Sequence, residues 1–399
     1  MQASKIAWKS VRLDPRELAI SKVLRCGQAF RWKQIDGIWS CSLRERVVLL
    51  KQDDDFLYYS AIFPANKNPE IDDTLEVVTD YFNLNVNLQN LYRLWSELDP
   101  AFEKKARVFG GIRMLRQDPW ENLVSFICST NNNVKRISKM CDSLCENYGE
   151  RIATFQGIDH YSFPGPEKLL DSESDLRELG FGYRAKYIEK TCQMFADDPT
   201  LRDQLYDQRS PKVSSLEAHE FLLQFTGVGP KVADCVCLMS LDKHEVVPVD
   251  THVFTFATRD YGYRFKGKKA VTLSKDVYID IRHFFETLWG DHAGWAHSVL
   301  FAADLSDLEN GVNIKSEVTD EVKRETKSDI KSDIKREIVV KTEDQVLEDK
   351  LAQRVKLEKL EEDLENLETI PKTPKTGRGL KRGRALKNKQ SSNKKALVV

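Results

Sequence analysis

Residues 217–259, EAHEFLLQFTGVGPKVADCVCLMSLDKHEVVPVDTHVFTFATR, decide the fold. An apolar helical pattern stops at the turn TGVGPK, residues 226–231, and resumes directly after it. Gly227 and Gly229 let the backbone turn at positive φ, and Pro230 suits the first turn of a helix, where its missing N–H costs nothing. The pattern predicts a helix-hairpin-helix, whose exposed N–H groups bind phosphate without reading base sequence.

The hairpin ends on a lysine, and a carboxylate follows it at the start of the next predicted helix. By itself Lys231 is a phosphate contact, as in hairpins that only grip a DNA backbone. Asp250, however, is held between Pro248 and Thr251 at the start of the next helix, so an amine and an acid can meet in one cleft. This pairing favours catalysis. The alternative for Asp250 is a helix cap, which is compatible with a catalytic role.

Composition and charge set the class of protein. A chain of 399 residues exceeds the usual single-domain size. The eight cysteines form no zinc-type pairs, no signal peptide precedes them, and no apolar run approaches a membrane span. We therefore expect a reducing, intracellular compartment and no membrane association.

Charge is distributed unevenly along the chain, although the formal net charge is only −1. Residues 371–399 carry ten Lys and Arg and no acid, while residues 306–370 carry 12 basic and 19 acidic residues. Residues 1–305 keep 39 basic and 43 acidic residues, so they must present positive charge as a local face to attract phosphate.

The expected fold class is α+β. Residues 1–115 contain alternating or apolar runs at 38–43, 47–51 and 56–62, which predict an N-terminal antiparallel sheet domain with flanking helices. Residues 116–305 show a helical period and predict a mostly α-helical body in two parts that carries the hairpin. Helices of this body are expected at 120–129, 135–148, 183–195, 271–289 and 295–304.

The remaining chain is expected to be a tail. Residues 306–370 lack aromatic side chains and predict a charged linker, disordered or weakly helical. Residues 371–399 predict a basic tail that serves nuclear import or nonspecific nucleic-acid binding. Five segments of the form aliphatic-Lys-x-Glu resemble sites for the small ubiquitin-like modifier, although a charged spacer is equally compatible with them; their lysines are Lys315, Lys323, Lys335, Lys341 and Lys356.

Further motifs match one family in order and spacing over about residues 8–305. They are CGQAFRW at 26–32, RQDP at 116–119, SFICSTNNN at 125–133, LGFGYRA at 179–185 and GWAHSVLF at 294–301. With the hairpin lysine and Asp250 they resemble the eukaryotic 8-oxoguanine DNA glycosylases of the helix-hairpin-helix superfamily. The resemblance implies excision of 8-oxoguanine opposite cytosine in double-stranded DNA by base flipping, followed by a lyase step that nicks the strand.

The resemblance gives the two catalytic residues their roles. Lys231 would attack C1′ of the damaged nucleotide, form a Schiff base and promote β-elimination. Because an amine nucleophile must be neutral, we expect its pKa to be lowered by desolvation or a neighbouring cation. Asp250, also in the base pocket, would stabilise positive charge developing on the sugar.

The base pocket is implied residue by residue. The carbonyl of Gly27 would accept the N7–H that only the oxidised base carries. Phe301 and Cys235 would sandwich the base, His297 would face its Watson–Crick edge, and Pro248 would complete the pocket. Without the resemblance, Gly27 is an ordinary turn, and Phe301 and Cys235 are ordinary core residues.

The DNA contacts follow from the same resemblance. Asn131 would fill the hole left by the flipped nucleotide, and Tyr183 would wedge beside it. Arg136 and Arg184 would read the orphaned cytosine. The backbone at Gly227 and Gly229, together with His252, would contact phosphates, and the carbonyls of Leu223, Phe225 and Val228 would hold a monovalent or calcium ion.

Two positions depart from the family pattern. Thr226 replaces the usual proline and should loosen the turn without removing it. His297 replaces the usual glutamine, so a neutral imidazole would satisfy one contact to the base and leave the other to water. An unperturbed histidine titrates near pH 6.5, so we expect lesion recognition to change between about pH 5.5 and 7.5.

Three functions remain open at this point. The favoured one is a bifunctional glycosylase and lyase for 8-oxoguanine; the others are a non-catalytic DNA-binding module and a glycosylase for a different damaged base. No cysteine follows Cys237, so an iron–sulfur cluster after the catalytic domain lacks ligands, and no cofactor is expected to be required. We expect a monomer in the nucleus, with the mitochondrion as a second location.

Overall fold

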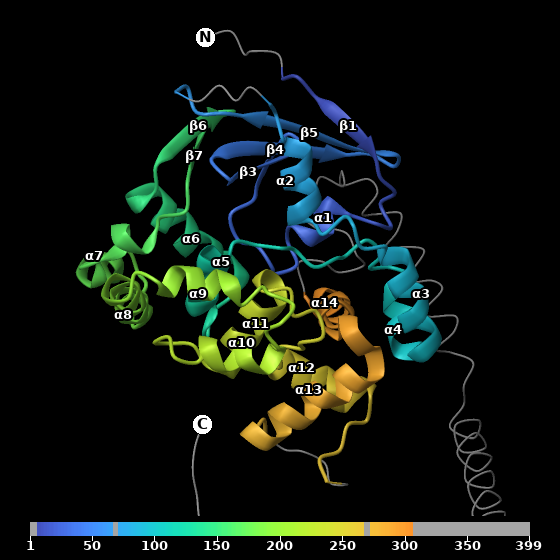
Figure 1. The fold of residues 1–399 in the computed structure, drawn as a ribbon. Helices are drawn as coiled ribbons and strands as arrows, with labels where there is room; N and C mark the ends of the chain where they lie inside the picture. The colour runs from blue at the N-terminus through green and yellow to red at the C-terminus, as the bar shows by residue number, and fades with distance from the viewer. Residues whose placement is uncertain (1–5, 67–70, 267–271, 306–399) are drawn as a thin grey trace, which may run out of the picture. The chain divides into compact units, whose positions relative to one another are not determined.

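The computed structural model describes residues 6–66, 71–266 and 272–305, which belong to one compact unit (Figure 1). The expected linker at 306–370, the basic tail at 371–399 and the five conjugation motifs lie outside the described residues. The domain boundary expected between residues 115 and 116 stays a prediction.

The N-terminal part contains a five-stranded antiparallel sheet with strand order β1-β5-β4-β3-β2. Its strands are β1 (Lys9–Arg12), β2 (Lys33–Ile35), β3 (Ile38–Leu43), β4 (Arg46–Gln52) and β5 (Phe56–Ile62). The three predicted strands are confirmed, with β4 one residue longer at each end. Sequence analysis missed β1 and β2, the two short edge strands, because short strands carry too little alternation to register.

Both faces of the central strand are covered, which explains its continuous apolar run. Val48 and Leu50 of β4 pack with Val78 of α2 (Thr74–Tyr81) in a core that also includes α1 (Ile20–Val23). On the opposite face Val47 and Leu49 pack against Phe155. The sheet is therefore sandwiched between helices and a second layer of strands.

That second layer is a β-hairpin, β6 (Arg151–Phe155) and β7 (Ile158–Tyr161), in the region predicted to be helical. Its turn residues Gln156 and Gly157 have φ of 46° and 79°. A two-residue turn with both φ positive matches the twist of paired strands. The available signal was Gln-Gly between two apolar segments. The prediction of a mostly helical body is confirmed, and this hairpin is an element that it did not include.

Helices make up the rest. They are α3 (Leu88–Leu98), α4 (Pro100–Ala106), α5 (Pro119–Ser129), α6 (Val134–Tyr148), the 3₁₀ turn η1 (Pro166–Leu169), α7 (Glu173–Glu178), α8 (Arg184–Asp197), α9 (Leu201–Asp207), α10 (Ser215–Leu222), α11 (Pro230–Ser240), α12 (Thr251–Asp260), α13 (Lys275–Trp289), the 3₁₀ turn η2 (Gly290–His292) and α14 (Ala293–Asp304). Four predicted helices are confirmed to within two residues. The fifth, predicted from residue 271, begins at Lys275, because the Ser274 hydroxyl accepts the Val277 N–H and caps it.

Two helices form the centre of the helical part. Helix α11 packs against α5, and Figure 1 shows both among the surrounding helices. Every residue of α11 from Val232 to Ser240 is buried. A helix that is buried all round must be apolar on most faces, as α11 is. Its N-terminal residue Lys231 consequently enters the interior of the protein rather than solvent.

Candidate active site

The predicted hairpin is present, formed by α10, a tight turn and α11. In the turn, the Val228 N–H donates to the Phe225 carbonyl at 3.1 Å. Gly227 has φ of +87°, and a Cβ there would stand 2.5 Å from the Tyr187 ring. The positive φ and the close approach of Tyr187 therefore each require glycine at this residue. Gly229 instead has φ of −101°, so the prediction that both glycines use positive φ is wrong for Gly229.

Asp250 begins α12 and acts as its cap. Its carboxylate accepts hydrogen bonds from the backbone N–H groups of His252 at 2.9 Å and Val253 at 3.1 Å. These bonds fix the carboxylate at a helix N-terminus, where the helix dipole favours negative charge. The capping alternative is therefore correct for Asp250, and it also holds the group in place for chemistry.

One cavity of about 40 Å³ gathers the predicted residues from separate parts of the chain. All seven predicted catalytic and base-binding residues line it: Gly27, Lys231, Cys235, Pro248, Asp250, His297 and Phe301. Five others line it that were not predicted as site residues: Cys26, Gln28, Phe126, Met239 and Ser298. Because a water needs roughly 10–15 Å³ by this measure, a purine enters only if lining side chains move.

The Lys231 amine lies 5.5 Å from the centre of the Phe126 ring. Burial acts to lower its pKa, but the Cys235 sulfur and the Asp250 carboxylate favour the ammonium and together raise the pKa above its usual value. The expected lowering is therefore wrong for the enzyme without DNA.

Cys235 and Gly27 both line the cavity. Burial raises the pKa of the Cys235 thiol to about 11, so it is a neutral thiol at physiological pH. Gly27 has φ of +83°, and a Cβ there would lie 3.5 Å from the Phe301 ring. A side chain at this residue would be strained by the positive φ, although its Cβ would make only ordinary contact with the ring. Gly27 is therefore a place where the backbone itself faces the site.

His297 lies on α14 with only 5% of its surface exposed. Its ring centre is 5.9 Å from that of Phe301, and neither ring nitrogen has a hydrogen-bond partner in the described part of the chain. Burial is the main cause that lowers the pKa of His297 to about 4. The Asp250 carboxylate acts to raise this pKa, and the Lys231 ammonium acts to lower it. The titration expected between pH 5.5 and 7.5 is therefore wrong. Two unpartnered nitrogens in a cavity are suited to a polar ligand.

Comparison with known proteins gives consistent results. Residues 10–123 match the family described as 8-oxoguanine DNA glycosylase, N-terminal domain, and residues 124–275 match HhH-GPD superfamily base excision DNA repair protein. The chain is 39% identical to an N-glycosylase/DNA lyase of Saccharomyces cerevisiae, over 73% of this chain and 85% of that protein. The chain therefore belongs to the 8-oxoguanine DNA glycosylase family.

Other members of the 8-oxoguanine DNA glycosylase family are similar over comparable lengths. An N-glycosylase/DNA lyase of Arabidopsis thaliana is 36% identical, over 75% of this chain and 80% of that protein. The 8-oxoguanine glycosylase/lyase of Clostridium acetobutylicum, solved with double-stranded DNA containing cytosine opposite 8-oxoguanine, superposes with a TM-score of 0.63. It is 31% identical, and the match covers 78% of this chain and all of that one.

The structure brings together three of the residues predicted to contact DNA. Asn131 is exposed, with φ of 48°, in the link between α5 and α6. The Tyr183 hydroxyl donates to the Thr130 carbonyl at 3.1 Å, and Arg184 donates to the carbonyls of Thr130 and Asn131. Arg184 is only 3% exposed, so it supports the Asn131 loop and must be released before it can read a base.

Arg136 and His252 lie at two other points of this glycosylase. Arg136 is exposed on α6 and donates to the Gly180 carbonyl at 3.1 Å. His252 is exposed, 3.4 Å from the Asp304 carboxylate, and its ring stands edge-on to Phe301. His252 therefore borders the base pocket, and its contact with phosphate stays a prediction.

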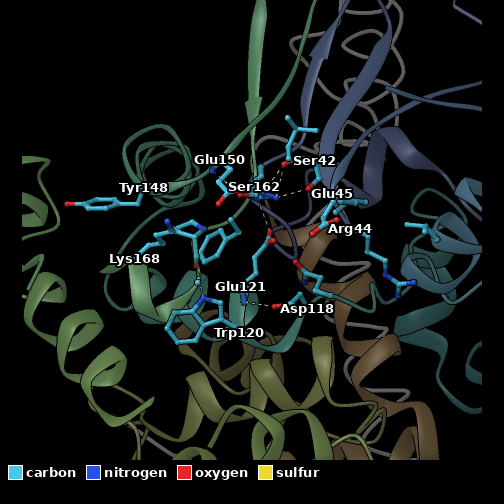
Figure 2. Close-up of a pocket in the computed structure, with 18 of the residues that line it drawn as sticks. Ser42, Arg44, Glu45, Asp118, Trp120, Glu121, Tyr148, Glu150, Ser162 and Lys168 are labelled. Atoms are coloured by element: carbon cyan, nitrogen blue, oxygen red, sulfur yellow. Dashed lines mark hydrogen bonds and ion pairs between the residues drawn. The ribbon is translucent and has the colours of Figure 1, made fainter. Parts of the chain in front are cut away.

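A second cavity, of about 640 Å³, lies between the sheet, the β6–β7 hairpin and helices α5 and α9 (Figure 2). None of the predicted site residues lines it. Figure 2 shows side chains of both charges around it, including Arg44, Glu121 and Lys168. Sequence reasoning gave no indication of this cavity, because its walls come from segments far apart in the chain.

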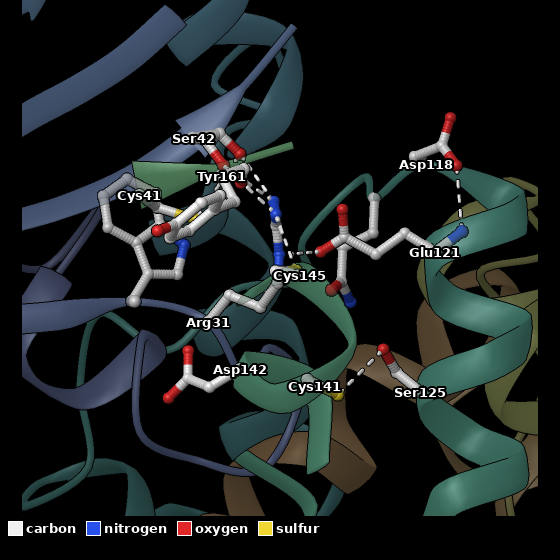
Figure 3. A network of polar contacts seen from close by, with 12 residues as sticks. Arg31, Cys41, Ser42, Asp118, Glu121, Ser125, Cys141, Asp142, Cys145 and Tyr161 are labelled. Atoms are coloured by element: carbon white, nitrogen blue, oxygen red, sulfur yellow. Dashed lines mark hydrogen bonds and ion pairs between the residues drawn. The ribbon is translucent and has the colours of Figure 1, made fainter. Parts of the chain in front are cut away.

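A buried ion pair stands at the wall of this second cavity (Figure 3). Arg31, 7% exposed, lies 2.9 Å from the Glu121 carboxylate and donates to the Ser42 carbonyl at 2.7 Å. The Ser42 hydroxyl donates to the Tyr161 carbonyl of β7. This network joins the sheet, the β6–β7 hairpin and α5, and explains the arginine in the CGQAFRW motif structurally.

Among the described residues, no group of three or more His, Cys, Asp and Glu side chains could hold a metal ion. None of the helices in the same part of the chain is long and apolar enough to cross a membrane.

Proposed function

We propose that this chain is a bifunctional DNA glycosylase that excises 8-oxoguanine opposite cytosine and then nicks the abasic strand. The observation that carries this proposal is that Lys231, Asp250 and Gly27 line one cavity in a chain of the 8-oxoguanine DNA glycosylase family. A module that only binds DNA does not need a buried amine near a carboxylate that caps a helix.

The reaction follows from the positions of these groups. The neutral Lys231 amine attacks C1′ of the flipped nucleotide, and the bond from C1′ to N9 breaks, so that the base leaves with the electron pair and takes up a proton. The negative Asp250 carboxylate stabilises the positive charge that develops on the sugar. The sugar ring opens to an imine on Lys231, and loss of a C2′ proton expels the 3′ phosphate by β-elimination.

Recognition of the lesion precedes this step. The Gly27 carbonyl accepts the N7–H of the oxidised base, whereas guanine would present a lone pair to it and leave two acceptors facing each other. Phe301 and Cys235 enclose the base from either side. The neutral His297 ring supplies one donor and one acceptor toward the Watson–Crick edge.

Borohydride trapping on an 8-oxoguanine:cytosine duplex tests the proposal. Wild type should form a covalent adduct and nick the strand, and Lys231→Gln should lose both while binding the lesion almost as well, since the amine serves the transition state. Absence of a wild-type adduct would count against the proposal. An adduct that persisted in Lys231→Gln would remove this lysine as the nucleophile.

The opposite base is the second part of the proposal. Asn131 fills the space left by the flipped nucleotide, Tyr183 wedges beside it, and Arg136 and Arg184 donate to the acceptors of cytosine. Support comes from the shared position of Asn131, Tyr183 and Arg184 around the Thr130 carbonyl. The enzyme acts as a monomer; sedimentation with and without DNA would test this.

An ion at the hairpin is a further proposal, and no separate cofactor is required. The Phe225 carbonyl already accepts the Val228 N–H, and a carbonyl keeps a second lone pair for an ion. The carbonyls of Leu223 and Val228 would complete the site, and an ion there would draw a DNA phosphate toward the hairpin. DNA affinity that does not differ between potassium and a bulky organic cation at equal ionic strength would argue against it.

Two proposals concern the tail, outside the described residues. The basic residues of 371–399 direct the enzyme to the nucleus, with the mitochondrion as a second location. Removal of residues 371–399 should leave a tagged protein outside the nucleus. The aliphatic-Lys-x-Glu motifs accept the small ubiquitin-like modifier. Peptide mapping after conjugation in vitro decides this, because modification confined to residues 6–305 would contradict it.

A further inference from the structure

A buried glutamine holds the loop that carries Gly27. The side chain of Gln28 is only 2% exposed. Its amide oxygen accepts the Leu115 N–H at 2.9 Å, and its amide nitrogen donates to the Arg113 carbonyl at 3.1 Å. The amide therefore pairs with a stretch of extended backbone as a neighbouring strand would. The carbonyl of Gly27 is fixed one residue away from this clamp.

A second glutamine connects that loop to the catalytic helix. The Gln117 side chain, 5% exposed, donates to the Gln28 carbonyl at 2.9 Å, and the Gln117 N–H donates to the Met239 carbonyl at 2.9 Å. Met239 belongs to the last turn of α11, where a carbonyl has no partner within its helix. Gln117 is thus bonded on one side to the lesion-reading loop and on the other to α11, the helix whose first turn contains Lys231.

Arg209 holds the Gln117 backbone against α11. Arg209 donates from Nη2 to the Gln117 carbonyl and from Nε to the Ser240 carbonyl at 2.6 Å. Both ends of this contact are backbone atoms, so Arg209 holds Gln117 against α11 without touching the cavity that contains Lys231. The link from Gly27 to Lys231 consequently runs through the Gln28 backbone, the Gln117 side chain and backbone, and helix α11.

We propose that Gln28 and Gln117 are positioning residues that set the Gly27 carbonyl relative to the Lys231 amine. This inference rests on the proposed function. The Gly27 carbonyl can distinguish the N7–H of 8-oxoguanine from the N7 lone pair of guanine only if it is held within a fraction of an ångström of its position. The Lys231 amine must reach C1′ at the same time. Cleavage at a preformed abasic site needs Lys231 but has no base to read. Loss of the bridge should therefore impair excision of the base selectively.

The test compares two reactions in the full chain. In Gln117→Met, which cannot donate to the Gln28 carbonyl, and in Gln28→Met, single-turnover excision from an 8-oxoguanine:cytosine duplex should slow by about tenfold, the worth of roughly one buried hydrogen bond. In the Gln117 variant, nicking of an abasic duplex, with its borohydride adduct, should stay within about twofold of wild type, since the bond to Met239 comes from the Gln117 backbone.

Gln52 supplies a matched control. Its amide bridges backbone in the same way, accepting the Ile20 N–H at 3.0 Å and donating to the Leu18 carbonyl at 2.5 Å, but it lines neither cavity. Gln52→Met should lose thermal stability with an unchanged ratio of the two rates. Equal slowing of both reactions in the Gln28 and Gln117 variants, or no slowing, overturns the inference. A wild type that nicks abasic DNA without releasing 8-oxoguanine would instead contradict the proposed function.

Discussion

At the scale of a residue, the proposed role of Lys231 makes the covalent step depend on the protonation of its amine. Cys235 and Asp250 raise the pKa of Lys231 against the effect of burial, so the neutral amine is scarce at physiological pH. Cys235→Ala removes one of the two contributions that raise the pKa of Lys231. The alkaline rise of single-turnover abasic-site nicking should therefore move to lower pH. Cys192→Ala, a buried cysteine of α8, should not move it, and a shift of the Cys235 variant to higher pH would contradict the assignment.

Asp250 combines two roles that one substitution separates. Asparagine caps a helix about as well as aspartate, so Asp250→Asn should keep the bonds to the N–H groups of α12 and leave the melting temperature nearly unchanged. Without the negative charge, base release should slow strongly. Single-turnover excision and thermal melting measure the two effects. A large loss of stability would mean that the charge serves the fold first.

If His297 faces the lesion as proposed, recognition of the lesion should be independent of pH. Because its pKa is lowered to about 4, the ring is neutral through the physiological range, and lesion affinity should be flat there. His297→Gln offers donor and acceptor on one small amide, and should tighten binding by about 0.5–1.5 kcal/mol. Equilibrium binding in a Lys231→Gln background measures both. An affinity that changed near pH 6.5 would show that the ring titrates as if exposed.

At the scale of an element, the hairpin turn depends on one of its two glycines. Gly227→Ala would impose a Cβ at positive φ and against Tyr187, and should destabilise the protein by at least about 1–2 kcal/mol. Gly229→Ala meets open space at an ordinary φ and should fold normally. Urea unfolding of the two variants makes the comparison. Equal losses would mean that the turn tolerates a side chain at neither position.

At the scale of the whole molecule, the buried pair Arg31–Glu121 ties the sheet to the helical part. Arg31→Met leaves a mostly buried carboxylate unpaired and should cost about 3–5 kcal/mol of unfolding free energy. Arg31→Met with Glu121→Met should cost clearly less than the sum of the single changes. A double-mutant cycle by urea unfolding measures the coupling. Strictly additive losses would show that the pair contributes nothing beyond its separate packing.

The sequence by itself determined the elements whose causes are local. Gly227 and Pro230 predict the hairpin through backbone conformation, and Asp250 predicts a helix start through its carboxylate. The motifs around Gly27 and Phe301 indicated the family, which is confirmed. The hairpin and the helix start are confirmed because neighbouring residues along the chain supply the physical reason for each.

Only the tertiary structure decided the properties that depend on distant neighbours. The pKa of Lys231 is raised by Asp250, and that of His297 is lowered by burial in the assembled cavity. Gln28 and Gln117 acquire their role because segments far apart in sequence meet there. Charge state and hydrogen bonding are set by whatever surrounds a group in space, and spacing along the chain does not specify those surroundings.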